Sequence, residues 1–177
     1  MLRRGDGASV VVLPGSGGSL AGAAPLISAL PPDATVVTVE HPGLDPHHRL
    51  AARYVQVVQA SFPHPACKLV VLAISLGGQV APEMAAMLSE LDGWAETEIN
   101  VYMLDSPAII PAHDTAHHPR LAFRYIQAKR GEEGNAVNWR EVLTGGTVYE
   151  VDCRHEDLWG ECHVGAPEAS DDDTPVL

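Results

Sequence analysis

The sequence contains few cysteines and no long apolar run, and each absence excludes a class of protein. Its three cysteines, Cys67, Cys153 and Cys162, include no CxxC pair, so we expect neither a disulfide framework nor a thiolate zinc site. No apolar stretch approaches the length that crosses a bilayer. The stretch "MLRRGDGASV" also lacks the apolar segment of a signal peptide. We therefore expect a cytoplasmic protein with reduced thiols and no membrane partner.

Basic residues are also scarce, because 11 lysines and arginines stand against 23 acidic residues and give a net charge of −12. This charge repels phosphate backbones, so we expect no nucleic-acid partner. The end of the chain, "PEASDDDTPVL", is too polar to be buried. A length of 177 residues suits one domain. We therefore predict a single domain over residues 1–162, followed by an acidic, disordered tail over 163–177.

Strand and helix patterns alternate along the chain. Short runs rich in β-branched residues predict six strands, at 8–14, 35–39, 68–74, 99–105, 121–128 and 147–151. Helical spacing of apolar residues predicts helices at 19–30, 48–62 and 77–91, with a short one at 138–143. This alternation predicts an α/β fold with a mainly parallel sheet of about six strands and helices on both faces. The chemistry of such a sheet lies in the loops beyond the carboxyl ends of its strands.

The stretch "VVLAISLGGQV" (70–80) places Ser75 directly after a predicted strand and two residues before Gly77, where a helix opens. A nucleophilic serine on a sharp strand-to-helix turn needs small residues two positions before and after it, and Ala73 and Gly77 fill these places. The usual pattern is GxSxG, and AxSxG differs by one methyl group. In an Ala- and Gly-rich chain, Ser75 could also be only a small residue that a turn requires.

The glycine-rich stretch "LPGSGGSL" (13–20) follows the first predicted strand. It contains no lysine and does not fit GxGxxG, so it matches neither of the common phosphate-binding loops. An oxyanion hole fits better. One backbone N–H would come from Leu76, after the nucleophile, and a second from Ser16 or Gly17.

Two further residues follow later strands and could complete a catalytic triad. Asp105 comes directly after the fourth predicted strand, and His155 lies just beyond the sixth. The chain order Ser, Asp, His is that of α/β hydrolases, and all three positions lie at carboxyl ends of strands. Taken singly, Asp105 could be a turn residue before Pro107 and His155 a surface histidine.

Several motifs together resemble the thioesterase domains of polyketide and nonribosomal peptide synthetases and their stand-alone relatives. They are "LPGSGGSL" (13–20), "HPG" (41–43), "AISLGG" (73–78), "VYMLDSP" (101–107) and "NWREVLTGGTVYEVDCRHEDLW" (138–159). The resemblance covers about residues 8–160. It implies an α/β-hydrolase fold and the hydrolysis or transfer of acyl groups from a phosphopantetheine thioester. The implied partner is an acyl or peptidyl carrier protein, or acyl-CoA, and no cofactor of the protein's own is implied.

The segment "SPAIIPAHDTAHHPR" (106–120) departs from this family, whose members carry a helical lid here. The segment is too short for such helices, so we expect the lid to be reduced to a short loop over an open site. The same segment contains His113, Asp114, His117 and His118, which could form a metal site. HxxxH spacing suits metal only on a helix, however, and prolines bracket the segment, so we predict a solvated loop and no metal.

The residues therefore predict a serine hydrolase in which Ser75 attacks, His155 is the base and Asp105 orients the imidazole. Acyl thioesterase activity is the leading hypothesis. A small-molecule carboxylesterase and a catalytically silent scaffold with the hydrolase fold remain as alternatives. The densest basic patch consists of Arg120, Arg124, Lys129 and Arg130 and is either a docking surface for an acidic carrier or only a strand flanked by solvated charges.

Overall fold

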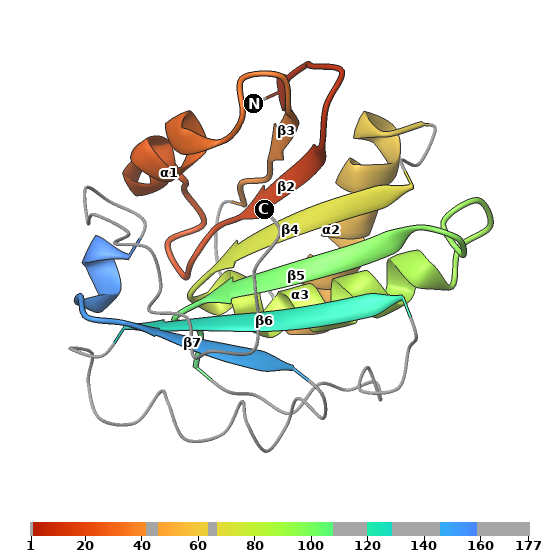
Figure 1. Cartoon of the computed structure of the whole chain (residues 1–177). Coiled ribbons are helices and arrows are strands. Elements are labelled where there is room, and N and C mark those ends of the chain that lie inside the picture. Colours follow the sequence, from red (N-terminus) through yellow and green to blue (C-terminus); the bar gives the residue numbers. More distant parts are fainter. Residues whose placement is uncertain (1, 42–45, 64–66, 108–119, 129–145, 159–177) are drawn as a thin grey trace.

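A computed structural model of the chain describes residues 2–41, 46–63, 67–107, 120–128 and 146–158 (Figure 1). The strands are β1 (Leu2–Arg3), β2 (Ser9–Leu13), β3 (Thr35–Thr38), β4 (Lys68–Ile74), β5 (Glu98–Leu104), β6 (Leu121–Ala128) and β7 (Thr147–Val151). The helices are α1 (Ala24–Ala29), α2 (His47–Ser61) and α3 (Leu76–Ser89), with 3-10 turns η1 (Ala21–Ala23) and η3 (His155–Asp157).

The strands form one seven-stranded sheet in the order β1-β3-β2-β4-β5-β6-β7. The strands from β2 to β7 run parallel, and only the short edge strand β1 pairs antiparallel, with β3. From β2 the chain moves outward to β3 and then crosses back to β4 on the other side of β2. The winding direction therefore reverses between β2 and β4. In a parallel sheet, this reversal opens a crevice at the carboxyl ends of the two strands.

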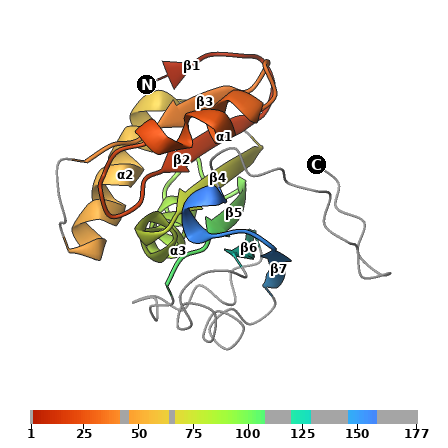
Figure 2. The same ribbon diagram turned by 90° about the vertical axis from the view of Figure 1, so that its left-hand side faces the viewer.

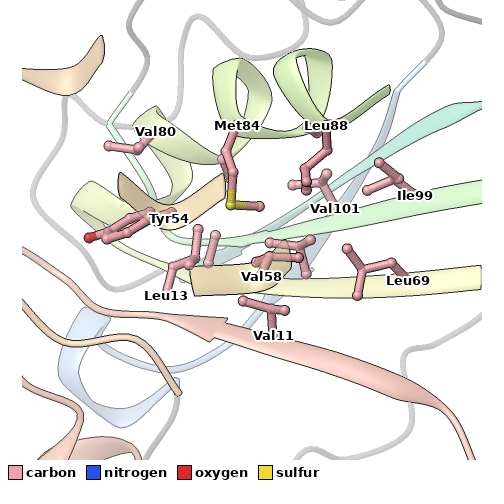
Figure 3. Close-up of a cluster of buried hydrophobic side chains, with 14 of the residues drawn as sticks. Val11, Leu13, Tyr54, Val58, Leu69, Val80, Met84, Leu88, Ile99 and Val101 are labelled. Atoms are coloured by element: carbon pink, nitrogen blue, oxygen red, sulfur yellow. The ribbon is translucent and has the colours of Figure 1, made fainter. Parts of the chain in front are cut away.

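Alternation along the strands places apolar side chains on both faces of the sheet. In β4, Leu69, Val71 and Ala73 belong to the core on one face, whereas Ile74 belongs to the core on the other. Figure 2 shows α2 and α3 together on the first face. Their buried side chains, such as Tyr54, Val58, Met84 and Leu88, meet those of the strands there (Figure 3). Burial of each such side chain contributes about 2 kcal/mol to the free energy of unfolding.

The smaller core lies on the opposite face, under α1. Leu26, Ile27 and Leu30 are partly buried and pack against it, and the core includes Val10 and Val12 of β2. The two faces are therefore covered by helices from different crossovers. This arrangement confirms the predicted layers, in which helices lie on both sides of a mainly parallel sheet.

The predicted elements match the structure closely, with three differences. All six predicted strands are present, and the prediction missed only β1, which is two residues long. The predicted helix at 19–30 is divided into η1 and α1, because Pro25 stands in the first turn of α1 and lacks the N–H that would continue a helix from before it. The short turn η3 was not predicted. The predicted short helix at 138–143, the lid segment over 108–119 and the tail over 163–177 lie outside the described residues.

Candidate active site

Ser75 occupies the turn that joins β4 to α3. Its φ is 48° and its ψ is −117°, a conformation that costs a residue with a side chain about 1–3 kcal/mol. Backbone hydrogen bonds on both sides hold the turn: Ser75 N–H donates to Leu104 O (2.9 Å), and Gly78 N–H donates to Ser75 O (2.9 Å). The turn therefore places Ser75 at the end of a central strand, as the N-cap of α3.

Small residues let the turn pack closely against its neighbours. A Cβ atom on Gly77 would lie 2.7 Å from the carbonyl oxygen of Pro14, and one on Gly78 would lie 1.8 Å from Ser106 Oγ. A Cβ on Gly15 would lie 3.3 Å from Ser75 Cβ. The first turn of α3 thus fits between the loop after β2 and the loop after β5, which brings residues from three strand ends together.

Asp105 and His155, which are 50 positions apart in the sequence, meet beside this turn. His155 Nδ1 lies 2.6 Å from Asp105 Oδ2. Asp105 is only 2% exposed, and its other carboxylate oxygen accepts a hydrogen bond from the Ala128 N–H at 3.2 Å. Its φ of 44° is the second positive value at a residue other than glycine. Both carboxylate oxygens are therefore engaged, and the contact at Nδ1 orients the imidazole.

Tyr125 of β6 is a further buried group next to this pair, and the sequence analysis missed it. Burial raises the pKa of its hydroxyl, and the negative charge of Asp105 raises that pKa further. The phenol therefore stays neutral beside the carboxylate. Tyr125 belongs to the core, but no pattern in the sequence indicates that this position adjoins Asp105.

Ser75 and His155 line one cavity of about 200 Å³. The rest of its lining is Gly15, Ser16, Gly17, Ser19, Gly22, Ala23 and Ile74. Four of these nine lining residues come from the stretch after β2, called here the glycine loop (residues 14–20). The cavity thus lies at the crevice where the winding reverses between β2 and β4. It is smaller than the roughly 300–1,000 Å³ of typical ligand pockets.

The structure thus brings together the positions singled out in the sequence. Ser75, Ser16, Gly17 and His155 border one cavity, Asp105 contacts His155, and Leu76 begins α3 directly after the serine. The histidines and the aspartate of the alternative metal site (113–118) lie outside the described residues. Within the described ranges, no group of three or more His, Cys, Asp or Glu side chains could hold a metal ion. None of the helices in those ranges is both long and apolar enough to cross a bilayer.

The two described arginines of the predicted basic patch have partners within the chain. Arg120 pairs with the Glu96 carboxylate and donates to the Glu96 carbonyl. Arg124 donates to Asn100 Oδ1 at 2.7 Å and lies over the ring of Tyr102, 5.2 Å from its centroid. Arg120 precedes β6 and so lies at the amino edge of the sheet, about 25 Å along the strand from the edge that carries Ser75. Arg120 therefore does not border the cavity.

No protein-family model and no curated protein sequence matches the chain, but solved structures resemble it closely in fold. One is a four-domain nonribosomal peptide synthetase bound to AMP and glycine, with a TM-score of 0.69 and 14% identity over 89% of this chain. The present chain spans only 18% of that synthetase. A type II thioesterase of the yersiniabactin pathway has a TM-score of 0.62 and 17% identity over 88% of both chains.

A third similar structure is a predicted CIB-like hydrolase from Thermoplasma acidophilum, with a TM-score of 0.63 and 10% identity over 87% of this chain and 80% of that one. At these identities the likeness concerns the fold and not the activity. It agrees with the parallel sheet and its covering helices. The chain therefore has the α/β-hydrolase fold.

Proposed function

We propose that this protein is a serine hydrolase that cleaves acyl thioesters carried on phosphopantetheine. The observation that carries the proposal is the geometry at the carboxyl edge. Ser75 is raised on a strained turn in the cavity that His155 also lines, and His155 Nδ1 lies 2.6 Å from the buried Asp105 carboxylate. A nucleophile, a base and an orienting acid are the three groups that acyl transfer through a covalent intermediate needs.

In the proposed reaction, His155 Nε2 takes the proton of the Ser75 hydroxyl as the oxygen attacks the thioester carbonyl. The negative charge on the carbonyl oxygen is stabilised by the N–H of Leu76 and by that of Ser16 or Gly17. The thiol leaves with the proton from His155, and Ser75 carries the acyl group. Water then attacks this ester with His155 again as base, and the products are a free acid and the original enzyme. Asp105 stabilises the imidazolium that forms in both halves.

The choice of thioester over oxygen ester rests on two kinds of similarity. The motifs after β2, β4, β5 and β7 resemble synthetase-associated thioesterases, and the structures of a nonribosomal peptide synthetase and of a type II thioesterase share this fold at 14% and 17% identity. The proposed partner is therefore a carrier protein or acyl-CoA, and the proposed site of action is the cytoplasm. No cofactor takes part in the proposed mechanism, because serine, histidine and aspartate suffice for it.

Labelling with a fluorophosphonate probe and assay with matched thioesters and oxygen esters test this proposal. We expect one label at Ser75, and we expect Ser75→Ala to abolish both labelling and turnover. Asp105→Asn should lower kcat by about 10³–10⁴-fold with little change in the midpoint of thermal unfolding, because an orienting charge is lost at almost constant volume.

Ser28→Ala is the matched control, since Ser28 is exposed on α1 and absent from the cavity lining. It should label and turn over like the wild type. Labelling that persists in Ser75→Ala would refute the assignment of the nucleophile. A preference for oxygen esters over thioesters of the same acyl group would favour the carboxylesterase, and the absence of any turnover would favour the silent scaffold.

A further inference from the structure

The residues after β3 contact the glycine loop at two separate points. β2 and β3 pair in parallel, with Val12 opposite Thr38, and Val39 N–H donates to Val12 O at 3.1 Å. The two strands therefore end side by side, and whatever follows β3 lies against whatever follows β2. Glu40 and His41 are these following residues. His41 opens the "HPG" stretch, to which the proposed mechanism gives no role.

His41 holds the middle of the glycine loop. Its backbone N–H donates to Gly18 O at 3.0 Å. Gly18 has a φ of 69°, and a Cβ there would lie 2.0 Å from His41 O and 3.0 Å from His41 Nδ1. His41 is only 5% exposed, and the centroid of its ring lies 6.2 Å from that of Tyr54. His41 thus packs between the glycine loop and α2, on the buried side of Gly18.

Glu40 holds the end of the same loop. Its Oε1 accepts a hydrogen bond from the Leu20 N–H at 3.3 Å, where η1 begins. The turn inside the loop is closed by Gly18 N–H, which donates to Gly15 O at 3.0 Å. Ser16 and Gly17, which are exposed and border the cavity, lie inside this turn, between Gly15 and Gly18. The residues that follow the candidate oxyanion donors are therefore held in place, Gly18 by His41 and Leu20 by Glu40.

We propose that Glu40 and His41 are positioning residues that hold the glycine loop so that its N–H groups face the oxyanion. This inference rests on the proposed serine-hydrolase function. A backbone donor cannot be replaced by mutation, and a displacement of about 1 Å can cost roughly a hundredfold in rate. Residues that hold the glycine loop in place therefore control transition-state stabilisation without touching the substrate.

The first test compares Glu40→Ala, Glu40→Gln and the control Glu90→Ala, which removes an exposed carboxylate at the far end of α3. Rates are normalised to the serines titrated by a fluorophosphonate. We expect Glu40→Ala to lower kcat about tenfold with KM within twofold. The inhibition constant of phenylboronic acid, whose tetrahedral adduct needs the oxyanion donors, should rise by the same factor. Glu40→Gln should retain activity, because its amide oxygen can accept the same hydrogen bond, and Glu90→Ala should match the wild type.

The second variant, His41→Ala, should lower kcat per titrated serine by roughly 10–100-fold and weaken phenylboronic acid in parallel. Because His41 is buried, His41→Ala also lowers the stability of the fold. The Glu40 variants are included because Glu40 is exposed and its replacement affects stability less. A wild-type kcat and boronate affinity per titrated serine in both Glu40→Ala and His41→Ala would overturn the inference alone. A wild-type protein that neither turns over esters nor binds the boronate would overturn the proposed function together with it.

Discussion

Ser75 and Asp105 are the two non-glycine residues with positive φ in the described chain, at 48° and 44°. Such conformations persist only where the surroundings determine them, and here adjacent strands do so. Ser75 N–H donates to Leu104 O, and Asp105 N–H donates to Ile126 O at 2.7 Å. Each strained residue thus adds one hydrogen bond between its own strand and the neighbouring strand before the chain turns away from the sheet. The strain is stored at the two positions where the proposed chemistry needs fixed side chains.

Gly78→Ala should lower the free energy of unfolding by about 1–3 kcal/mol and also lower kcat. The added Cβ would lie 1.8 Å from Ser106 Oγ and 2.5 Å from Ser106 Cβ, so either α3 or the loop that begins with Asp105 must move. Urea denaturation and kcat per titrated serine measure the two effects. Gly17→Ala is the control for stability, because its Cβ would have no atom within 4 Å. Equal stability of the two variants would show that the contact between α3 and Ser106 is not tight.

At the scale of elements, α3 is the most buried of the described helices. It begins at the candidate nucleophile and packs against both α2 and the sheet, so that it is buried on nearly all sides. Small residues such as Ala81 and Ala85, both fully buried, let these neighbours approach. This burial explains why apolar residues occur on nearly all sides of α3, whereas α2 has an exposed polar side that includes Arg49 and Arg53.

Ala85→Leu should lower the free energy of unfolding by about 1–3 kcal/mol, because the packed core around α3 has no space for three more carbon atoms. The same change at Ala60, which is exposed on α2, should leave stability within about 0.5 kcal/mol of the wild type. Urea denaturation with a far-UV signal measures both. A stable Ala85→Leu would mean that α2 and α3 do not pack as closely as described.

At the scale of the whole molecule, buried tyrosines make stability sensitive to alkaline pH. Burial raises the pKa of Tyr54 from 10.0 to about 12, with a smaller opposite effect of Arg53. Below pH 10 the phenol is neutral in the folded and unfolded states. Between pH 10 and 12 the unfolded state ionises first, so the stabilisation is lost as the pH rises through this range.

We therefore expect the free energy of unfolding of the wild type to fall by up to about 3 kcal/mol more than that of Tyr54→Phe between pH 9 and 12, since one pKa unit corresponds to about 1.4 kcal/mol. Urea denaturation at several pH values measures the difference. Tyr125 contributes in the same direction, so Tyr54→Phe should keep part of the loss. Parallel curves for wild type and Tyr54→Phe would show that Tyr54 ionises equally easily in both states.

The size of the cavity predicts weak selectivity for acyl chain length. A cavity of about 200 Å³ whose lining is glycines, serines, one histidine, one alanine and one isoleucine offers little apolar surface to a long chain. Each buried methylene contributes roughly 0.8 kcal/mol, so a site that buries few of them distinguishes acyl groups poorly. We expect kcat/KM for straight-chain thioesters from acetyl to decanoyl to vary about tenfold or less, with free acid as the product. A sharp optimum at one length would require a deeper acyl pocket than this cavity.

Local patterns in the sequence were sufficient to predict the layers of the fold and the position of the candidate nucleophile. Strands such as "KLVVLAI" are apolar on both sides, and this property alone indicates a parallel sheet covered by helices. The turn at Ser75 was predictable because the small residues Ala73 and Gly77 stand at fixed offsets from it. The departure at η1 and α1 shows the limit of periodicity, since Pro25 and not the apolar spacing decides where that helix begins.

Contacts between distant segments, in contrast, were decided only by the tertiary structure. The pairing of Asp105 with His155 across 50 positions, the burial of Tyr125 beside Asp105, and the contacts of Glu40 and His41 with the glycine loop depend on which strands lie next to each other. Periodicity reports which face of its own element a residue occupies, but not which residue of another element faces it. The order β3-β2-β4-β5-β6-β7 supplies that information, because it brings the carboxyl ends of all these strands to one edge.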